Sequence, residues 1–136
     1  MSAAEVLAEL NARINTIEEA YEYMLAYASQ GLASDTDNDT GRQAREHLTK
    51  CDAALTNFGE FLTGFLGRLG VQPIAPYLAF VSVIERDSRD ASAALQLVLA
   101  QPAISSQMVD NLNASIHLRA LLTDLFLIDE VLKAHR

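Results

Sequence analysis

The sequence predicts an all-α protein, an antiparallel up-and-down bundle of four long helices in one domain over residues 1–136. Half of the 136 residues are hydrophobic, and only three prolines and six glycines occur, which favours helix. Apolar residues recur at alternating spacings of three and four through four long segments, as on the buried side of a helix. Short connections join the segments, and such connections favour antiparallel neighbours.

The first predicted helix begins almost at the N-terminus. Ser2 and Glu5 have the spacing of a capping box, in which the two side chains satisfy free N–H groups of the first turn. Gly31 follows the last apolar position and is expected to end the helix. The apolar positions between these signals are Leu7, Leu10, Ile14, Ile17, Tyr21, Met24 and Ala28.

The second predicted helix runs from about residue 40 to residue 70. Thr40 and Gln43 form a second capping box, and Gly70 is the expected C-cap. The single cysteine, Cys51, lies among the apolar positions, so we expect a buried thiol rather than a reactive one. The apolar positions of this helix are Ala44, Leu48, Cys51, Leu55, Phe58, Leu62, Phe65 and Leu69.

The third predicted helix lies between two prolines. Pro76 suits a first helical position, and Pro102 closes the segment. The polar stretch from Glu85 to Asp90 indicates a kink or a thin section of core near the middle. The stripe expected to face the core consists of Tyr77, Val81, Ile84, Ser88, Ala91, Leu95 and Val98.

The last predicted helix, from about Met108 to Leu132 with Ser105 or Ser106 as its cap, is apolar on two opposed sides. A helix of this kind must either be central in the bundle or meet another chain on one side. One side carries Leu118, Leu121, Leu125, Ile128 and Leu132, and the far side carries Met108, Leu112, Ile116, Phe126 and Leu127.

Two groups of residues are therefore predicted to meet a partner. Ile116, Phe126 and Leu127 provide the second apolar side of the last helix, and a two-fold homodimer would bury them; another protein is the alternative partner. Tyr23 and Tyr27 are four residues apart, off the main stripe, and Tyr is enriched at interface hot spots. These two tyrosines are equally explained as capping the edge of the bundle.

The charge balance limits the classes of partner. The formal net charge of −8 argues against nucleic acid and against an anionic membrane surface, because both are recognised by clustered Lys and Arg. The sequence has no basic N-terminal region followed by an apolar run, and its apolar runs are shorter than a bilayer span. We therefore expect a cytoplasmic protein without membrane or nucleic-acid binding.

An acidic loop between the first two helices is the most suggestive motif. Asp35, Asp37 and Asp39 alternate, and Glu46 stands at the twelfth position counted from Asp35. This dozen residues resembles the calcium loop of the EF-hand family, although the turn glycine of that family is replaced here by Thr40. The resemblance implies Ca²⁺ held by these four carboxylates. The alternative is a solvated loop whose acids favour the N-terminus of the following helix.

Two histidines suggest catalytic alternatives. Asn113, His117 and Asp124 are predicted to share one side of the last helix, and His117-Leu118-Arg119 is similar to the dimerisation helix of histidine kinases, which implies phosphotransfer. Arg42 and His47 have the spacing of the RNA-cleaving motif of HEPN-type helical domains, which implies acid catalysis beside a charge stabiliser. Polar boundary residues and exposed helix charges are the plainer interpretations of both groups.

The function predicted from these observations is a small interaction or regulatory module that self-associates or binds a protein, with no catalytic role and no cofactor. Calcium binding, phosphotransfer or RNA cleavage, and an apolar ligand in the bundle core are the alternatives left open.

Overall fold

The computed structural model describes residues 2–135, and these form an all-α fold without a β-strand. Four segments were predicted as helices, whereas the structure contains six α-helices, because two of the predicted helices are each divided by a break. The elements are α1 (Ala3–Ala28), α2 (Asp39–Ala54), α3 (Phe58–Leu69), α4 (Ala75–Leu99), α5 (Ser106–Ala114), α6 (His117–Leu132) and the short 3₁₀ helix η1 (Lys133–His135).

Helix α1 starts as predicted, because the side chain of Ser2 accepts a hydrogen bond from the backbone N–H of Glu5 at 3.1 Å. The helix ends at Ala28, three residues before Gly31, which has a positive φ of 66°. Its buried side is rotated slightly from the predicted stripe at both ends. The buried residues are Val6, Leu10, Ile14, Ile17, Ala20, Met24 and Tyr27, while the predicted Leu7, Tyr21 and Ala28 are half-buried.

The second predicted helix is divided into α2 and α3 between Leu55 and Asn57. Asn57 adopts a left-handed conformation with φ 54°, which Asn tolerates better than most residues. The break leaves the carbonyl of Thr56 without a helical partner, and Arg13 of α1 donates to it at 2.8 Å. Periodicity did not reveal the break, because Leu55 and Phe58 on either side of it both remain buried.

The start of α2 differs from its predicted cap, whereas the end of α3 agrees with its predicted cap. The N-cap of α2 is Asn38, whose side chain accepts from the N–H of Gly41 at 2.6 Å, so the predicted capping box at Thr40 and Gln43 is wrong. The predicted end of α3 at Gly70 is confirmed, with φ 65°. Cys51 is fully buried in α2, as expected.

Helix α4 agrees closely with its prediction. Pro76 lies in the first turn, and the helix ends at Leu99, before Pro102. All the predicted core positions from Val81 to Val98 are buried, including Ser88, and Tyr77 is half-buried.

The last predicted helix is divided into α5 and α6. The side chain of Ser105 caps α5 by accepting a hydrogen bond from the N–H of Met108 at 3.0 Å. The helix is interrupted at Ile116, which adopts a positive φ of 63°. Because the break reorients α5, Leu112 is buried in the chain's own core and Met108 packs against it. The two apolar sides therefore do not belong to one continuous rod, which corrects the predicted long helix.

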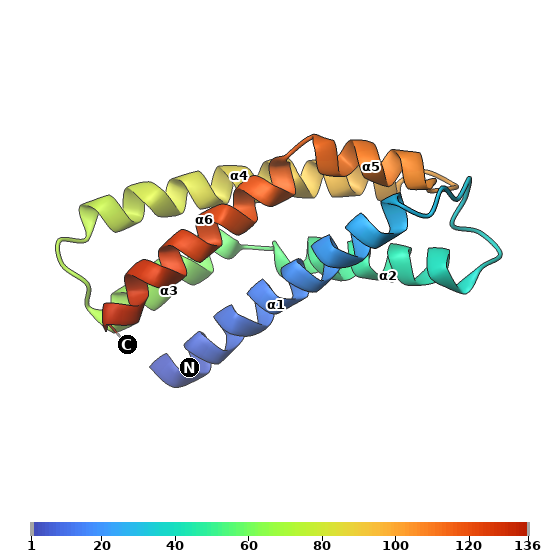
Figure 1. The fold of residues 1–136 in the computed structure, drawn as a ribbon. Helices are drawn as coiled ribbons and strands as arrows, with labels where there is room; N and C mark the ends of the chain where they lie inside the picture. Colours follow the sequence, from blue (N-terminus) through green and yellow to red (C-terminus); the bar gives the residue numbers. More distant parts are fainter. Residues whose placement is uncertain (1, 136) are drawn as a thin grey trace.

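The helices are arranged around α1 and α4. Figure 1 shows α2 and α3 following one another along one side of α4, with α5 and α6 along another. Helix α1 contacts α2, α3, α5 and α6. None of the helices described is long and apolar enough to cross a membrane.

Candidate functional site

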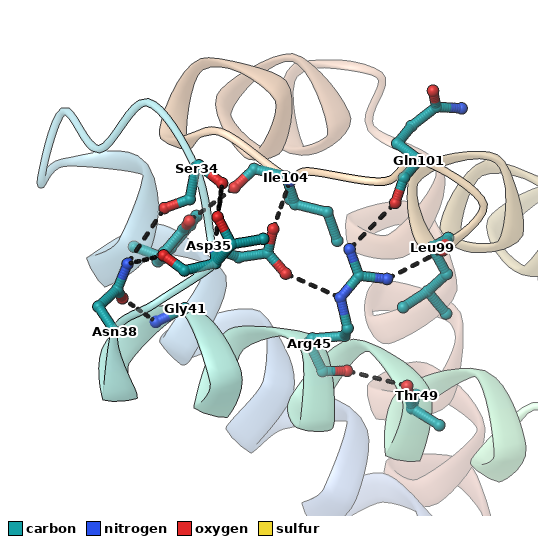
Figure 2. Close-up of polar contacts among 11 residues, drawn as sticks. Ser34, Asp35, Asn38, Gly41, Arg45, Thr49, Leu99, Gln101 and Ile104 are labelled. Atoms are coloured by element: carbon teal, nitrogen blue, oxygen red, sulfur yellow. Dashed lines mark hydrogen bonds and ion pairs between the residues drawn. The ribbon is translucent and has the colours of Figure 1, made fainter.

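A buried ion pair holds the acidic loop against the rest of the chain (Figure 2). Asp35 is 6% exposed, and its Oδ2 accepts a hydrogen bond from Nε of Arg45 at 2.8 Å. Its Oδ1 accepts from the backbone N–H of Ile104 at 2.6 Å. The other guanidinium nitrogens of Arg45 donate to the carbonyls of Leu99 and Gln101, each at 3.0 Å. One pair of side chains therefore joins the loop, α2 and the connection between α4 and α5.

The charge of Asp35 is maintained by these donors. Burial raises the pKa of the carboxyl group, but the hydrogen bonds from Arg45 and Ile104 and the positive charge of Arg45 outweigh burial and lower the pKa below its ordinary value. Asp35 is consequently ionised at neutral pH, with both oxygens engaged by donors of the chain itself. The geometry indicates a structural tie.

Of the four residues predicted to hold calcium, Asp35, Asp37 and Asp39 line one hollow together with Arg42, and Glu46 does not line it. Asp35 faces inward to Arg45, Asp39 forms an ion pair with Arg42, and Asp37 and Glu46 are exposed. In residues 2–135, no group of three or more His, Cys, Asp or Glu side chains is placed to hold a metal ion. Calcium binding stays a prediction, and calorimetry with millimolar calcium would test it.

Tyr27 was predicted as an interface residue, and this is wrong because its side chain is fully buried in the chain's own core. Its hydroxyl donates to the carbonyl of Ile104 at 2.7 Å, and its own carbonyl accepts from the hydroxyl of Ser106 at 2.6 Å. Tyr23 is half-buried, and its hydroxyl donates to the carbonyl of Thr40 at 2.9 Å. The bundle-edge interpretation fits Tyr23 better than a free interface anchor.

Arg42 and His47 are engaged with different neighbours. Arg42 forms its ion pair with Asp39, whereas the ring of His47 stacks on the ring of Tyr23 with centroids 4.5 Å apart. RNA cleavage by this pair stays a prediction without a shared pocket to support it.

The three predicted polar residues of the last helix are divided by the break at Ile116. Asn113 belongs to α5, and both polar atoms of its amide are buried without a hydrogen-bond partner in residues 2–135. His117 is exposed at the start of α6. Within residues 2–135 no hydrogen bond or ion pair joins His117 to Asn113 or Asp124, and phosphotransfer at His117 stays a prediction.

Asp124 of α6 lies beside a residue that sequence reasoning missed, Asp87 of α4. Burial, the hydrogen bond to Asp87 and the charge of Asp87 together raise the pKa of Asp124 from 3.8 to about 7. Oδ2 of Asp124 is buried and no donor within residues 2–135 reaches it, so the ionised form of this carboxyl group is poorly stabilised. A proton shared between Asp124 and Asp87 is therefore favoured. The only signal for Asp87 in the sequence was the polar stretch in the middle of its helix.

Two apolar grooves flank α4 on the side where α5 and α6 lie. The α4–α6 groove, of ≈ 310 Å³, is lined by Pro76, Tyr77, Phe80, Leu127, Ile128 and Val131. The α4–α5 groove, of ≈ 380 Å³, is lined mainly by apolar side chains that include Leu97, Val98, Met108 and Leu112. Neither groove carries a charged side chain, so both suit apolar contact rather than chemistry on a polar substrate.

The exposed apolar residues gather largely on these helices. Leu97 is 68% exposed, Leu127 53%, and Val131 41%, and each lines one of the two grooves. The predicted interface residues Ile116 and Phe126 are also about half-exposed. Phe126 follows the buried Leu125 and precedes Leu127, so it points to a different side of α6 from the α4–α6 groove, which it does not line.

The chain matches no protein-family model, no curated protein and no solved structure. The candidate site therefore depends on the geometry of this chain alone.

Proposed function

We propose that the protein is a non-catalytic interaction module that self-associates through α4 and the two apolar grooves beside it. The observation that carries this proposal is the exposure of Leu97, Leu127 and Val131 around grooves that share one helix. Fully burying a Leu side chain contributes about 1.5–3 kcal/mol. Grouped apolar side chains of this kind mark interaction surfaces more often than isolated ones do.

The proposed assembly is a two-fold homodimer. A two-fold interface presents the same surface on both copies, and the side of α4 with its grooves offers both protruding and recessed apolar features. We further propose that α1, α2–α3, α4 and α5–α6 act as the four antiparallel rods of one bundle, which would leave this side of α4 free for the second copy.

Sedimentation at increasing concentration tests the proposal. The wild-type chain is expected to shift from monomer to dimer by high micromolar concentration, and Leu97→Asp and Leu127→Asp are each expected to oppose that shift. Leu25→Asp is the matched control, because Leu25 is 49% exposed on α1, away from both grooves. A wild-type chain that stays monomeric at the highest concentration would overturn self-association.

A further inference from the structure

The outer side of α4 carries a regular strip of residues turned away from the core. Along this strip the spacing alternates strictly between three and four, which is typical of a helix seam that packs against another helix. All members are exposed except Val83, which is partly buried. The outer α4 strip consists of Pro76, Ala79, Val83, Arg86, Asp90, Ala93 and Leu97.

From Ala79 to Leu97 the outer α4 strip is symmetric about the position of Ser88. Arg86 and Asp90 lie two residues before and after Ser88, Val83 and Ala93 lie five residues away, and Ala79 and Leu97 lie nine residues away. When two copies of α4 cross antiparallel with their outer strips in contact at the level of Ser88, whose own side chain is buried in the core, each of these positions therefore meets the other member of its own pair. A two-fold axis produces every such contact twice.

The pairs are complementary in charge and in size. Arg86 would face Asp90 of the second copy, Val83 would face the smaller Ala93, and Leu97 would face the smaller Ala79. The opposite pairing of charges favours this register over one that places Arg86 opposite Arg86. Large side chains facing small ones allow two helices to approach closely.

Arg86 and Asp90 are available for contacts between copies. Both are exposed, and neither takes part in an ion pair formed within residues 2–135. They are one turn apart on the same helix, but a cation placed N-terminal to an acid is the weaker order for attraction within a helix. Pairing across a two-fold axis gives both charges a partner.

The same register provides an occupant for the α4–α6 groove. Leu97 lies about 14 Å from Ser88 along the helix at 1.5 Å per residue, and Ala79 lies the same distance away in the other direction. Ala79 lies one helical turn after Pro76, which belongs to the outer α4 strip and also lines the groove. Leu97 of the second copy would therefore reach the edge of the groove that Leu127 and Val131 complete.

We infer that a second copy of this chain docks on the outer α4 strip, antiparallel and centred on Ser88, with Arg86 paired to Asp90 and Leu97 seated over Ala79 beside the α4–α6 groove. This inference rests on the proposed function, since it specifies which residues of the dimer meet.

Charge reversal followed by mixing tests the pairing. Arg86→Glu places Glu opposite Asp90, and Asp90→Arg places Arg opposite Arg86, so each variant alone is expected to dimerise at least about tenfold more weakly. An equimolar mixture of the two variants is expected to form a heterodimer close to wild-type strength, because both contacts become attractive again. Loss of a pair within one helix could not produce rescue by mixing.

A disulfide trap tests the register independently. Val83→Cys/Ala93→Cys is expected to give a covalent dimer on mild oxidation, whereas each single cysteine variant gives none. Within one chain the two positions are about 15 Å apart, and the same separation divides each position from its equivalent in the other copy, which is too far for a disulfide. Burial and the charge of Asp52 raise the pKa of Cys51 to about 12, so its thiol does not compete.

The outcomes separate the inference from the proposed function. Rescue by mixing together with selective cross-linking of the double cysteine variant supports the inferred register. A wild-type dimer with no rescue, or with equal cross-linking of single Ala93→Cys, overturns the register while self-association stands. A wild-type chain that remains monomeric overturns both, provided that circular dichroism shows every variant folded.

Discussion

Asp35 and Arg45 form an ion pair of 2.8 Å between Oδ2 and Nε, and this pair joins the acidic loop and α2 to the connection between α4 and α5, which is distant in sequence. The Asp35 side chain is 5% exposed and that of Arg45 is 34% exposed. Removing one partner from such a pair leaves the charge of the other partner uncompensated. Water can then replace only part of the lost hydrogen bonds, because the site is largely buried.

Asp35→Asn is therefore expected to lower the free energy of unfolding by about 3 kcal/mol, the lower end for buried pairs because Arg45 is partly solvated. Chemical denaturation at neutral pH measures the loss. Asp37→Asn is the matched control in the same loop, since Asp37 is exposed and Asn tolerates its positive φ. Equal effects of the two substitutions would contradict the structural role of the tie.

The same ion pair predicts a contribution to stability that depends on acid pH. Because the pKa of Asp35 is lower in the folded chain than its ordinary value of 3.8, the contribution is complete above pH 3.8 and is lost as the pH falls through the folded value. Unfolding followed from pH 6 downward should show less acid sensitivity in Asp35→Asn than in the wild type. An unchanged acid transition would contradict this account.

Gly41 is expected to tolerate no side chain. A Cβ atom there would overlap the backbone of Asp35, whereas one at Gly67 of α3 would meet nothing within 4 Å. Gly41→Ala should therefore destabilise by about 1–3 kcal/mol through overpacking. Gly67→Ala should stabilise by up to about 1 kcal/mol, because alanine is the better helix former. Thermal melts of both variants would reveal opposite shifts, and shifts of the same sign would contradict the close approach at Gly41.

Asp124→Asn is expected to make the protein more stable at alkaline pH. The pKa of Asp124 is raised to about 7, so the folded chain loses stability relative to the unfolded chain as the pH rises from about 4 to 7, and the loss is complete above pH 7. An amide is neutral throughout and can donate to Asp87. The melting temperature of the variant should exceed that of the wild type at pH 8, by a margin that shrinks as the pH falls and vanishes at about pH 4. A difference that is constant with pH would be inconsistent with the shared proton.

Tyr27→Phe should reveal the contribution of a buried hydroxyl. The substitution removes the 2.7 Å hydrogen bond to the carbonyl of Ile104 and leaves that acceptor unsatisfied, at a cost of about 1–3 kcal/mol. Tyr21→Phe is the control on the same helix, because Tyr21 is half-buried and its hydroxyl forms no hydrogen bond within residues 2–135. Urea denaturation of the two variants should separate them clearly.

Part of the fold could be predicted because it depends on local signals. The cap at Ser2, the end of α3 at Gly70, the cap at Ser105 and the core positions of α4 from Val81 to Val98 are all confirmed. Each of these features is determined by residues within one or two turns of helix. The breaks at Asn57 and Ile116 were missed, because apolar side chains before and after each break still reach the core and so preserve the periodicity.

The candidate site shows the same division. The exposure of Ile116, Phe126 and Leu127 followed from the pattern of the last segment, but the grooves beside Leu97 and Leu127 exist only because α4 lies next to α5 and α6. The sequence by itself determined where helices form and which of their sides are apolar, since these depend on spacing along the chain. The tertiary structure decided that Asp35 and Arg45 bind the backbone of Ile104 and Leu99 and that Asp124 meets Asp87, because the partner of a polar group depends on which distant segments the packing of the core brings together.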